Sequence, residues 1–557
     1  MRDEKNSTAK SRRREDMVDS EVSTRPPDPA PFGPTPSAAH ASSLRPHPFA
    51  LRSSIRSWLD RAVIVCLFLL AVCAPHSIAA TQVAWASGML FWVVRLLMRP
   101  RPRLQRTPLD YALLGFFILT VISSLVSYDP LISIGKLRGA SLFTIVYLVA
   151  ENVSSKRALR YLTYALIASC MINVVYVLAE RAVGRGVKVA GLTQAGPLYA
   201  AGVRDGDTLL EVDGRALHNP EELLAALSSS SDSDGAGTGN APPPQPPARV
   251  RIYRYEWTPT FEVARGQLQA GATTLKRLGI EGWSRGRDWR ASGFYGHYTT
   301  YAEALQLIAS LALGLLIALR KWRTRAAALL ILTLFGLCLA LLLTVTRASW
   351  LAFLLSSSLI VLLGASRRTA LILAACAVPV ILAGLFVLQQ KRNVSFFDSR
   401  DDSINWRKTV QREGLHLLAS KPRHLLVGVG MDSIKRYWRE WGLFDNGRIP
   451  MGHMHSTPLQ LAVERGVPTL VAWLILVGLY ARMLWRGVVS SRDTGGWVER
   501  GVMLGALGGL VGFLASGLVH YNFGDSEVAM IFYFIMGLSL VVERQARSQS
   551  GATESDA

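Results

Sequence analysis

His455 is the residue of this sequence whose type and position most favour chemistry. It stands in the run Gly452-His453-Met454-His455-Ser456, directly before a predicted helix that reads LQLAVERG. An imidazole at a helix start is held by a rigid element, and it can accept a proton near neutral pH without a metal. We therefore expect His455 to be a general base, with His453 and Ser456 as secondary candidates. The alternative is a histidine that only caps the helix.

Three arginines lie at the edges of apolar runs, where a charge needs an anionic partner. Arg347 is the only charge in the hairpin LLLTVTRASWLAF, and burying an unpaired guanidinium near a bilayer is costly. Arg407 follows Trp406 at the start of a polar stretch, and Arg290 begins the segment RASGFYGH. A guanidinium binds phosphate oxygens in a bidentate way, so we expect the three to converge on one polyanion. The alternative for each is a side chain that reaches lipid headgroups.

The acidic residues Asp398, Asp401 and Asp402 are a weaker candidate site. Carboxylates can hold a divalent cation beside a diphosphate, but the spacing DSRDD is not a metal signature, and solvated loop charge is the simpler interpretation. Neither a P-loop nor a dinucleotide-binding fingerprint occurs in the sequence. We expect no metal and no cofactor.

Apolar runs of membrane-spanning length must position these residues. Half of the 557 residues are hydrophobic, and the runs recur from residue 61 to residue 542. The sequence predicts a polytopic α-helical membrane protein with about twelve transmembrane helices. All five cysteines fall inside predicted spans, so we expect no disulfide between extramembrane segments. We expect spans at 62–80, 83–98, 109–127, 131–150, 158–179, 298–319, 326–345, 350–364, 370–388, 467–484, 501–519 and 528–542.

Positive charge orients these spans. The net charge of +21 gathers largely in short basic clusters beside apolar runs, where anionic lipid attracts it, so we expect no nucleic-acid partner. The clusters fall on alternate connections, which the positive-inside rule places in the cytoplasm together with both termini. We expect a multi-pass protein of the bacterial inner membrane. Its predicted parts are a disordered cytoplasmic tail (1–56), transmembrane helices (57–183, 285–388 and 457–545), a periplasmic catalytic loop (389–456) and a cytoplasmic tail (546–557).

The predicted periplasmic loop is itself basic. Between residues 391 and 448 it carries twelve Lys or Arg against seven Asp or Glu. Long loops escape the charge rule, which is one explanation, and phosphate binding is the other.

A second soluble segment interrupts the spans at 184–270. Short β-branched stretches, turns at Asp205-Gly206-Asp207 and Asp213-Gly214, and a helix start near Asn219 predict a small α+β domain. The pattern AGV, GD and EVDG resembles a PDZ domain of the bacterial protease type. Such domains bind extended peptides by strand addition, so a peptide ligand is expected. The usual carboxylate-binding loop is not recognisable, and the alternative is a scaffold that positions neighbouring loops.

Two other classes of function fit less well. An intramembrane protease needs a HExxH helix or a GxSxG nucleophile, and the sequence has neither. A glycan or lipid transporter with a PDZ docking module should carry polar residues deep inside several spans, and we expect spans almost free of them.

The motifs, taken in order, resemble the O-antigen ligase and polymerase superfamily of lipid-linked glycan transferases. They are RxxGF from Arg290, TRA around Arg347, WR at Arg407, the stretch from KP to GVG (421–430), and His455-Ser followed nine residues later by Gly466. The resemblance covers residues 60–183 in topology and 285–545 in motifs.

The resemblance implies transfer of a glycan from undecaprenyl diphosphate to an acceptor hydroxyl at the periplasmic face. The acceptor is lipid A core in ligases, another glycan in polymerases and a protein Ser or Thr in related oligosaccharyltransferases. It further implies that His455 is the essential histidine and that Arg347, Arg407 and Arg290 bind the diphosphate. The inserted segment departs from the family pattern, and so does Ser456, where asparagine is commoner.

Overall fold

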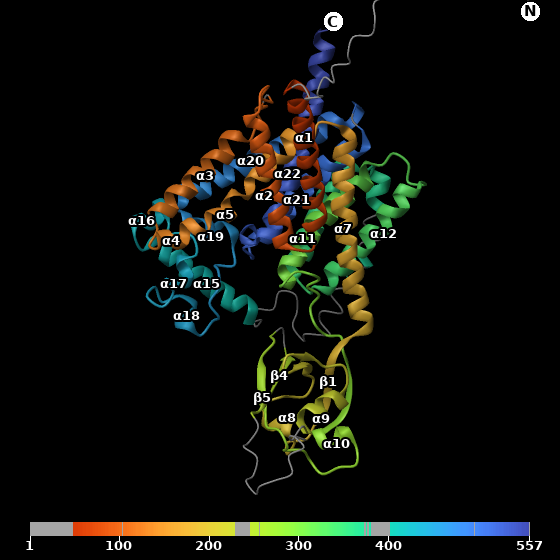
Figure 1. Ribbon diagram of the computed structural model, residues 1–557, viewed down its shortest axis with the longest axis vertical. Helices are drawn as coiled ribbons and strands as arrows, with labels where there is room; N and C mark the ends of the chain where they lie inside the picture. The colour runs from red at the N-terminus through yellow and green to blue at the C-terminus, as the bar shows by residue number, and fades with distance from the viewer. Residues whose placement is uncertain are drawn as a thin grey trace, which may run out of the picture. The chain divides into compact units, whose positions relative to one another are not determined.

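Long apolar helices make up most of the described chain (Figure 1). Nine helical segments within the described residues are long and apolar enough to cross a bilayer. The chain is therefore a polytopic helical membrane protein. One unit comprises Ser54–Ala557, and of the preceding unit, Met1–Ser53, only the first residues of helix α1 are described. The computed structural model describes residues 48–102, 104–228, 246–254, 257–372, 402–494 and 496–555, with residues 375, 378, 379 and 382 singly in between.

The predicted first span, 62–80, ends early. Helix α1 stops at Cys73, and α2 begins at Ile78 after Ser77, whose side chain accepts a hydrogen bond from the Ala80 N–H. The expected span passed over Pro75 and Ser77, although a proline disfavours helix continuation and a serine favours a new helix start. The predicted span at 370–388 lies largely outside the described residues. The remaining helices of the membrane part are α3 (Asp110–Leu125), α4 (Pro130–Gly135), α5 (Leu137–Ala140), η1 (Ser141–Phe143), α6 (Thr144–Asn152), α7 (Lys156–Val183), α11 (Tyr298–Ala318), α12 (Arg325–Leu343), α13 (Arg347–Gly364), α20 (Val467–Thr494), α21 (Trp497–Gly517), η2 (Asn522–Gly524) and α22 (Ser526–Ser555).

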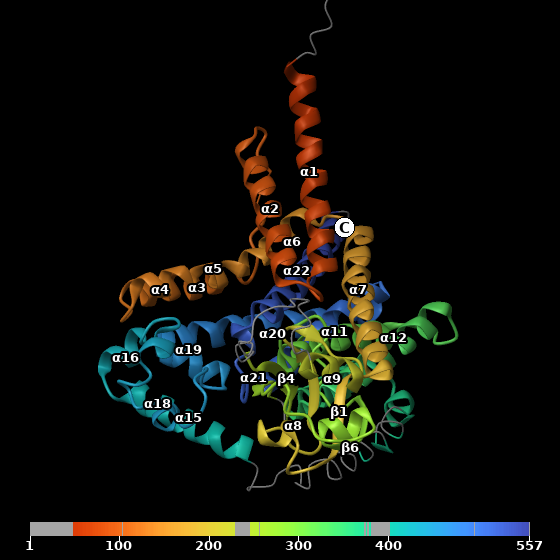
Figure 2. The same cartoon turned by 60° about the horizontal axis from the view of Figure 1, so that its bottom comes forward.

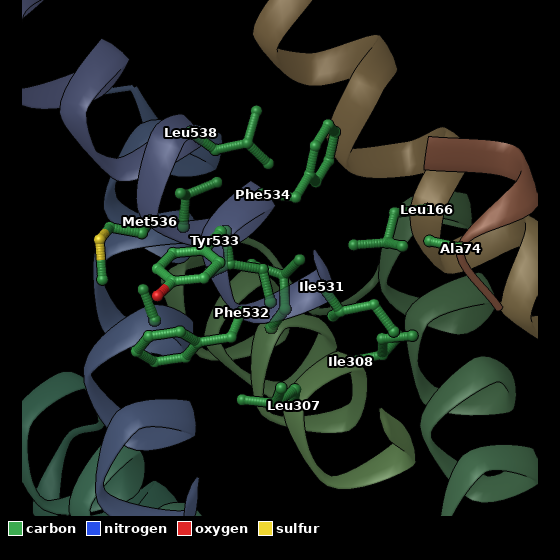
Figure 3. Packing of buried hydrophobic residues seen from close by; sticks show 14 of the residues in the cluster. Ala74, Leu166, Leu307, Ile308, Ile531, Phe532, Tyr533, Phe534, Met536 and Leu538 are labelled. Carbon is green, nitrogen blue, oxygen red and sulfur yellow. The ribbon is translucent and has the colours of Figure 1, made fainter. Parts of the chain in front are cut away.

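Helix α11 is the most enclosed of the candidate spans, with its whole apolar window buried. Glycines of α21 allow this enclosure, because a Cβ on Gly505 would lie 2.6 Å from the Cα of Leu311. Small residues let two helix backbones approach closely inside a membrane. On another side α22 contributes Phe532 and Tyr533 to the same apolar core (Figure 3).

The expectation that the spans are almost free of polar residues is wrong for α11. Glu303, Gln306 and Ser310 are all buried there. The Gln306 side chain donates to Ser310 Oγ (3.2 Å), and Ser310 is 2.6 Å from Ser356 Oγ of α13. Gln306, Ser310 and Ser356 thus satisfy one another's hydrogen bonds inside the bundle, where water is absent.

The described part of the predicted loop between α13 and α20 contains five helices. It has a hydrophobic core of its own, which includes Val410, Phe444 and Met454. Residues 389–401 lie outside the described residues. We call residues 402–466 the helical loop region. Its elements are α15 (Asp402–Ala419), α16 (Pro422–Val427), α17 (Ser433–Tyr437), α18 (Leu443–Gly447) and α19 (Thr457–Arg465).

The inserted segment folds as an antiparallel sheet with strand order β5-β4-β2-β1-β6, and β3 pairs with β2. Strands β1, β4 and β6 of this sheet are labelled in Figure 2. Its core is separate from that of the membrane helices and includes Val187, Leu209 and Val250. The sheet continues past residue 270, because β6 pairs along β1, with Lys188 opposite Ser284. The elements are β1 (Arg185–Leu192), α8 (Pro197–Ala200), β2 (Thr208–Val212), β3 (Arg215–Ala216), α9 (Pro220–Ser228), β4 (Ala248–Tyr253), β5 (Thr260–Val263), α10 (Thr274–Leu278) and β6 (Ile280–Gly286).

Candidate active site

His455 stands one residue ahead of the cap of α19. Ser456 is the N-cap, and its side chain accepts a hydrogen bond from the Leu459 N–H, so capping belongs to the serine. His455 has φ 46°, a left-handed conformation that a residue with a side chain adopts at a cost, and such strain gathers at functional sites. Its backbone N–H donates to Nδ1 of His453 over 3.1 Å. The local backbone therefore holds the two imidazoles together.

Helix α15 brings an arginine to this histidine. The Trp406 and His455 rings meet edge to face, with centroids 4.4 Å apart, and the Arg407 Cζ lies 5.2 Å from the Trp406 ring. One turn further along, Gln411 Nε2 donates to the His455 carbonyl over 3.2 Å. Arg407 and His455, which are distant in sequence, therefore contact the same indole.

Glycines fix the far end of α19. Gly466 has φ 84° and ψ 161°, and a Cβ there would lie 2.4 Å from the Leu426 carbonyl oxygen. Gly428 has φ 72°, and a Cβ on it would lie 2.4 Å from the Glu464 carbonyl. The backbones of α16 and α19 thus approach through two glycines. This accounts physically for the spacing between His455 and Gly466, since the glycine positions the helix on which the histidine stands.

Arg290 lies at a second group of contacts, beside the connection that leads to Arg347. The Ala291 N–H donates to the Leu343 carbonyl over 2.9 Å, which joins the segment of Arg290 to the end of α12, four residues before Arg347 begins α13. The Arg290 Cζ is 4.4 Å from the Tyr298 ring. The His297 ring also stacks on Tyr298, and the centroids of the two rings are 4.3 Å apart.

Burial and nearby positive charge keep the histidines neutral. Burial, followed by the nearby His453, Arg407, His520 and His297, lowers the pKa of His455 to about 2. Burial, followed by the charges of His520 and other cations, lowers the pKa of His453 to about 4. Because the charge of His297 affects both, the two groups of contacts share one electrostatic environment. A neutral imidazole can accept a proton.

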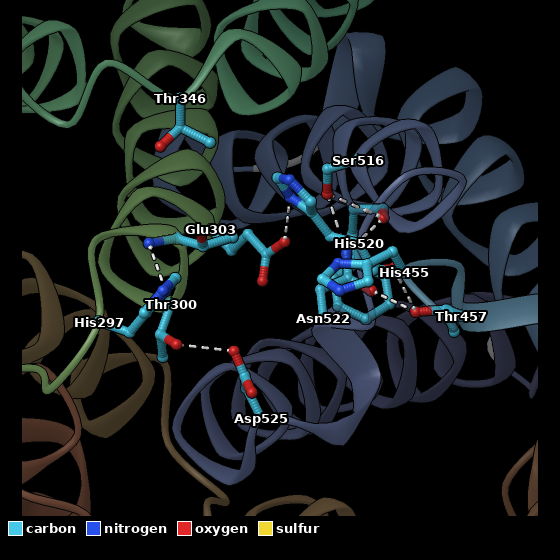
Figure 4. Close-up of polar contacts among 12 residues, drawn as sticks. His297, Thr300, Glu303, Thr346, His455, Thr457, Ser516, His520, Asn522 and Asp525 are labelled. Atoms are coloured by element: carbon cyan, nitrogen blue, oxygen red, sulfur yellow. Dashed lines mark hydrogen bonds and ion pairs between the residues drawn. The ribbon is translucent and has the colours of Figure 1, made fainter. Parts of the chain in front are cut away.

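Sequence reasoning missed three residues that border this site. His520 and Asp525 lie between α21 and α22, and Glu303 lies in α11 (Figure 4). Glu303 Oε1 is 3.0 Å from His520 Nδ1, and Thr300 Oγ1 donates to Asp525 over 2.7 Å. Burial, together with the charge of Glu303, raises the pKa of Asp525 to about 7. A signal was present, because Glu303 is the only charged residue in α11.

The acidic cluster predicted from the sequence lies outside the part of the chain whose side chains the structure describes. Asp398 and Asp401 lie outside the described residues, and the side chain of Asp402 is not described either.

Fold and site together define a multi-pass helical membrane protein. Its candidate site residues, histidines and arginines, lie in and beside the connections between the membrane helices. Residues 332–474 match the family model of the O-antigen ligase domain. The matched stretch runs from α12 into α20 and contains Arg347, Arg407 and His455. This match supports a relationship to the O-antigen ligase superfamily and the activity of a membrane glycosyltransferase of the ligase or polymerase type.

Two curated proteins are similar over a short stretch. The magnetosome formation proteases MamE of Magnetospirillum gryphiswaldense and of Paramagnetospirillum magneticum are each 51% identical to this chain over 45 residues. That stretch is 8% of this chain and 6% of each protease. The chain therefore spans only a small part of the length of these relatives.

Proposed function

We propose that this protein moves a glycan from an undecaprenyl diphosphate carrier to an acceptor hydroxyl, with lipid A core as the acceptor. The observation that carries the proposal is the meeting of His455 and Arg407 on Trp406 inside the stretch that matches the O-antigen ligase domain. A base and a phosphate-binding cation side by side are what such a transfer needs.

The donor supplies the driving force in this proposal. The site faces the periplasm, which holds neither ATP nor nucleotide sugars, so the bond must come from a previously activated glycan. Arg347, Arg407 and Arg290 bind the diphosphate and stabilise the charge that grows on it. The protein lies in the bacterial inner membrane with both termini in the cytoplasm, as its basic clusters favour. Transfer on this scheme uses no metal and no cofactor.

His455 takes the proton of the acceptor in the proposed step. The acceptor oxygen attacks the anomeric carbon, the bond from that carbon to the phosphate oxygen breaks, and its electron pair leaves with undecaprenyl diphosphate. The acceptor proton goes to the neutral imidazole, and a single displacement inverts the anomeric centre. Arg407 lowers the pKa of His455, and the bound diphosphate offsets the charge of this arginine. Donor binding therefore raises the pKa of His455 and makes the imidazole a stronger base.

Variants of the purified protein test these roles. His455→Ala should abolish transfer and leave donor binding largely intact. Arg347→Ala should weaken donor binding, and unchanged affinity in that variant would remove Arg347 from the diphosphate site. Normal transfer by His455→Ala would refute the proposed base.

The acceptor is tested by competition. Purified protein and lipid-linked glycan are mixed with lipid A core, free glycan and a Ser- and Thr-containing peptide, and mass spectrometry shows which acceptor gains mass. Growth of the free or lipid-linked glycan alone would identify a polymerase, and glycosylation of the peptide a protein oligosaccharyltransferase. Movement of the lipid-linked glycan across the membrane without transfer would identify a transporter.

The inserted sheet supports a separate proposal, a peptide ligand. Its sequence pattern resembles a PDZ domain, and β5 and β6 are the end strands of the sheet. A peptide could add to such an end through main-chain hydrogen bonds. Binding of labelled C-terminal peptides to intact protein, compared with protein lacking residues 185–286, measures it.

A further inference from the structure

Glu303 and His520 form a buried pair that the proposed reaction has not yet used. Glu303 Oε1 lies 3.0 Å from His520 Nδ1 (Figure 4). Glu303 is 2% exposed and His520 is 7% exposed. Among the described residues, the second carboxyl oxygen of Glu303 has no hydrogen-bond partner, so the hydrogen bond of this carboxyl group goes to the histidine.

The loop that carries His520 is attached to the start of α19. Thr457 Oγ1 donates to the His520 carbonyl over 3.2 Å and lies 2.8 Å from Asn522 Oδ1. The ring of Tyr521 lies 5.7 Å from that of His453. The loop that carries His520 therefore contacts His453 and Thr457, which lie two residues to either side of His455.

The electrostatic interactions of His520 agree with this placement. The charge of His520 lowers the pKa of His455, and Arg407 lowers the pKa of His520, although burial is the larger cause in both cases. His520 thus lies within electrostatic reach of both the proposed base and a proposed diphosphate ligand.

The number of protons on the Glu303-His520 pair decides whether Nε2 of His520 carries a hydrogen that it can donate. A buried pair avoids net charge, so Glu303 and His520 share one proton between the carboxyl oxygen and Nδ1. Whether that proton is on the oxygen or on Nδ1, the other ring nitrogen, Nε2, carries a hydrogen. Among the described residues Nε2 of His520 has no hydrogen-bond partner, so this N–H remains available to a ligand oxygen.

We propose that His520 donates its Nε2 hydrogen to an oxygen of the donor diphosphate, and that Glu303 is the positioning residue that holds the imidazole in this state. The proposal rests on the proposed function. The pair is neutral in the empty site, and as charge grows on the departing diphosphate the shared proton moves from Glu303 to Nδ1. The cation then faces the diphosphate and the pair as a whole stays neutral. The arginines, by contrast, are charged at all times.

Binding of undecaprenyl diphosphate to three His520 variants tests the proposal. The amide nitrogen of glutamine can reach the place of Nε2, and that of asparagine only the place of Nδ1. His520→Gln should bind within about threefold of the unaltered protein, whereas His520→Asn and His520→Leu should lose about tenfold or more, the range for a hydrogen bond to a charged group. Thermal unfolding of each variant checks the fold, and the comparison of Gln with Asn stands even if the leucine variant unfolds.

Nitrogen NMR of labelled histidine tests the part of Glu303. The unaltered protein should show His520 with hydrogen on Nε2, and Glu303→Leu should show a mixture of tautomers. Equal binding by His520→Gln and His520→Asn, or an unchanged tautomer in Glu303→Leu, would overturn the proposal. If the unaltered protein neither binds undecaprenyl diphosphate nor transfers glycan, the proposed function itself fails. If it does both and only the His520 variants behave alike, this inference alone fails.

Discussion

Replacing Gly466 with alanine tests how the site is held together. Gly466 ends α19 with φ 84° and ψ 161°, a region of backbone conformation that glycine almost alone adopts. The added Cβ would lie 2.4 Å from the Leu426 carbonyl oxygen and 2.8 Å from the Val427 nitrogen. Both neighbours are backbone atoms of α16, so neither can turn aside as a side chain could.

The expected loss of stability in Gly466→Ala is the sum of a conformational cost and a packing cost. The unfavourable conformation costs about 1–3 kcal/mol for a residue with a side chain, and forcing an extra carbon into a packed contact costs about 1–3 kcal/mol more. Gly466→Ala should therefore destabilise the protein by about 2–6 kcal/mol. Because α19 carries His455 at its other end, transfer should fall along with stability.

Unfolding by sodium dodecyl sulfate in mixed micelles, followed by tryptophan fluorescence, measures the change. Gly478→Ala is the matched control, because a Cβ on Gly478 in α20 meets nothing within 4 Å and alanine favours a helix. That variant should be as stable as the unaltered protein or slightly more so. Equal unfolding of the two variants would refute the account of α16 and α19 as a glycine-mediated contact.

Three further predictions concern charge. Arg407→Lys should weaken binding of undecaprenyl diphosphate about tenfold, because an ammonium lacks the bidentate fork, whereas the control Lys408→Arg should leave it unchanged. Transfer needs neutral His455, whose pKa lies far below 6.5 in the empty site and rises when the diphosphate binds. In profiles of rate against pH, kcat should therefore fall on the acid side at a higher pH than kcat/KM does. If both fall at the same pH, this prediction is wrong. The raised pKa of Asp525 means that the folded protein holds this proton more tightly than the unfolded chain does. The proton therefore stabilises the fold at low pH, and this stability is lost as the pH rises towards 7. Between pH 5 and pH 7.5, the melting temperature of Asp525→Asn should therefore fall less than that of the unaltered protein.

Hydrophobic length alone was enough to predict the helical membrane architecture, because a run of about 20 apolar residues has few other uses. Hydrophobic length by itself did not locate helix ends, because the run counted from residue 62 to residue 80 passes over the turn at Pro75 to Ser77, which separates α1 from α2. The spacing of strand-like stretches indicated a small domain, but the end of its sheet was missed because β6 pairs with β1 from the far side of a loop and α10.

For the site, residue types and motif order pointed to His455 and Arg407, and the fold places both against Trp406. Their roles in binding and proton transfer remain predictions. Glu303 and His520 could not be paired from the sequence, because 216 residues separate them and only the packing of α11 against α21 brings them together. Contacts of this kind depend on tertiary structure, and no local periodicity encodes them.

The way in which the inserted sheet joins the membrane part has a consequence for engineering. Gly184 alone separates α7 from β1, and on the return path Arg181 donates to the Trp289 carbonyl over 2.8 Å. The two ends of the excursion therefore lie next to each other. A shortened chain in which a few small residues bridge Val183 and Trp289 would recover a plain connection between neighbouring helices, so the whole sheet can be excised as a cassette without pulling Arg290 from its place.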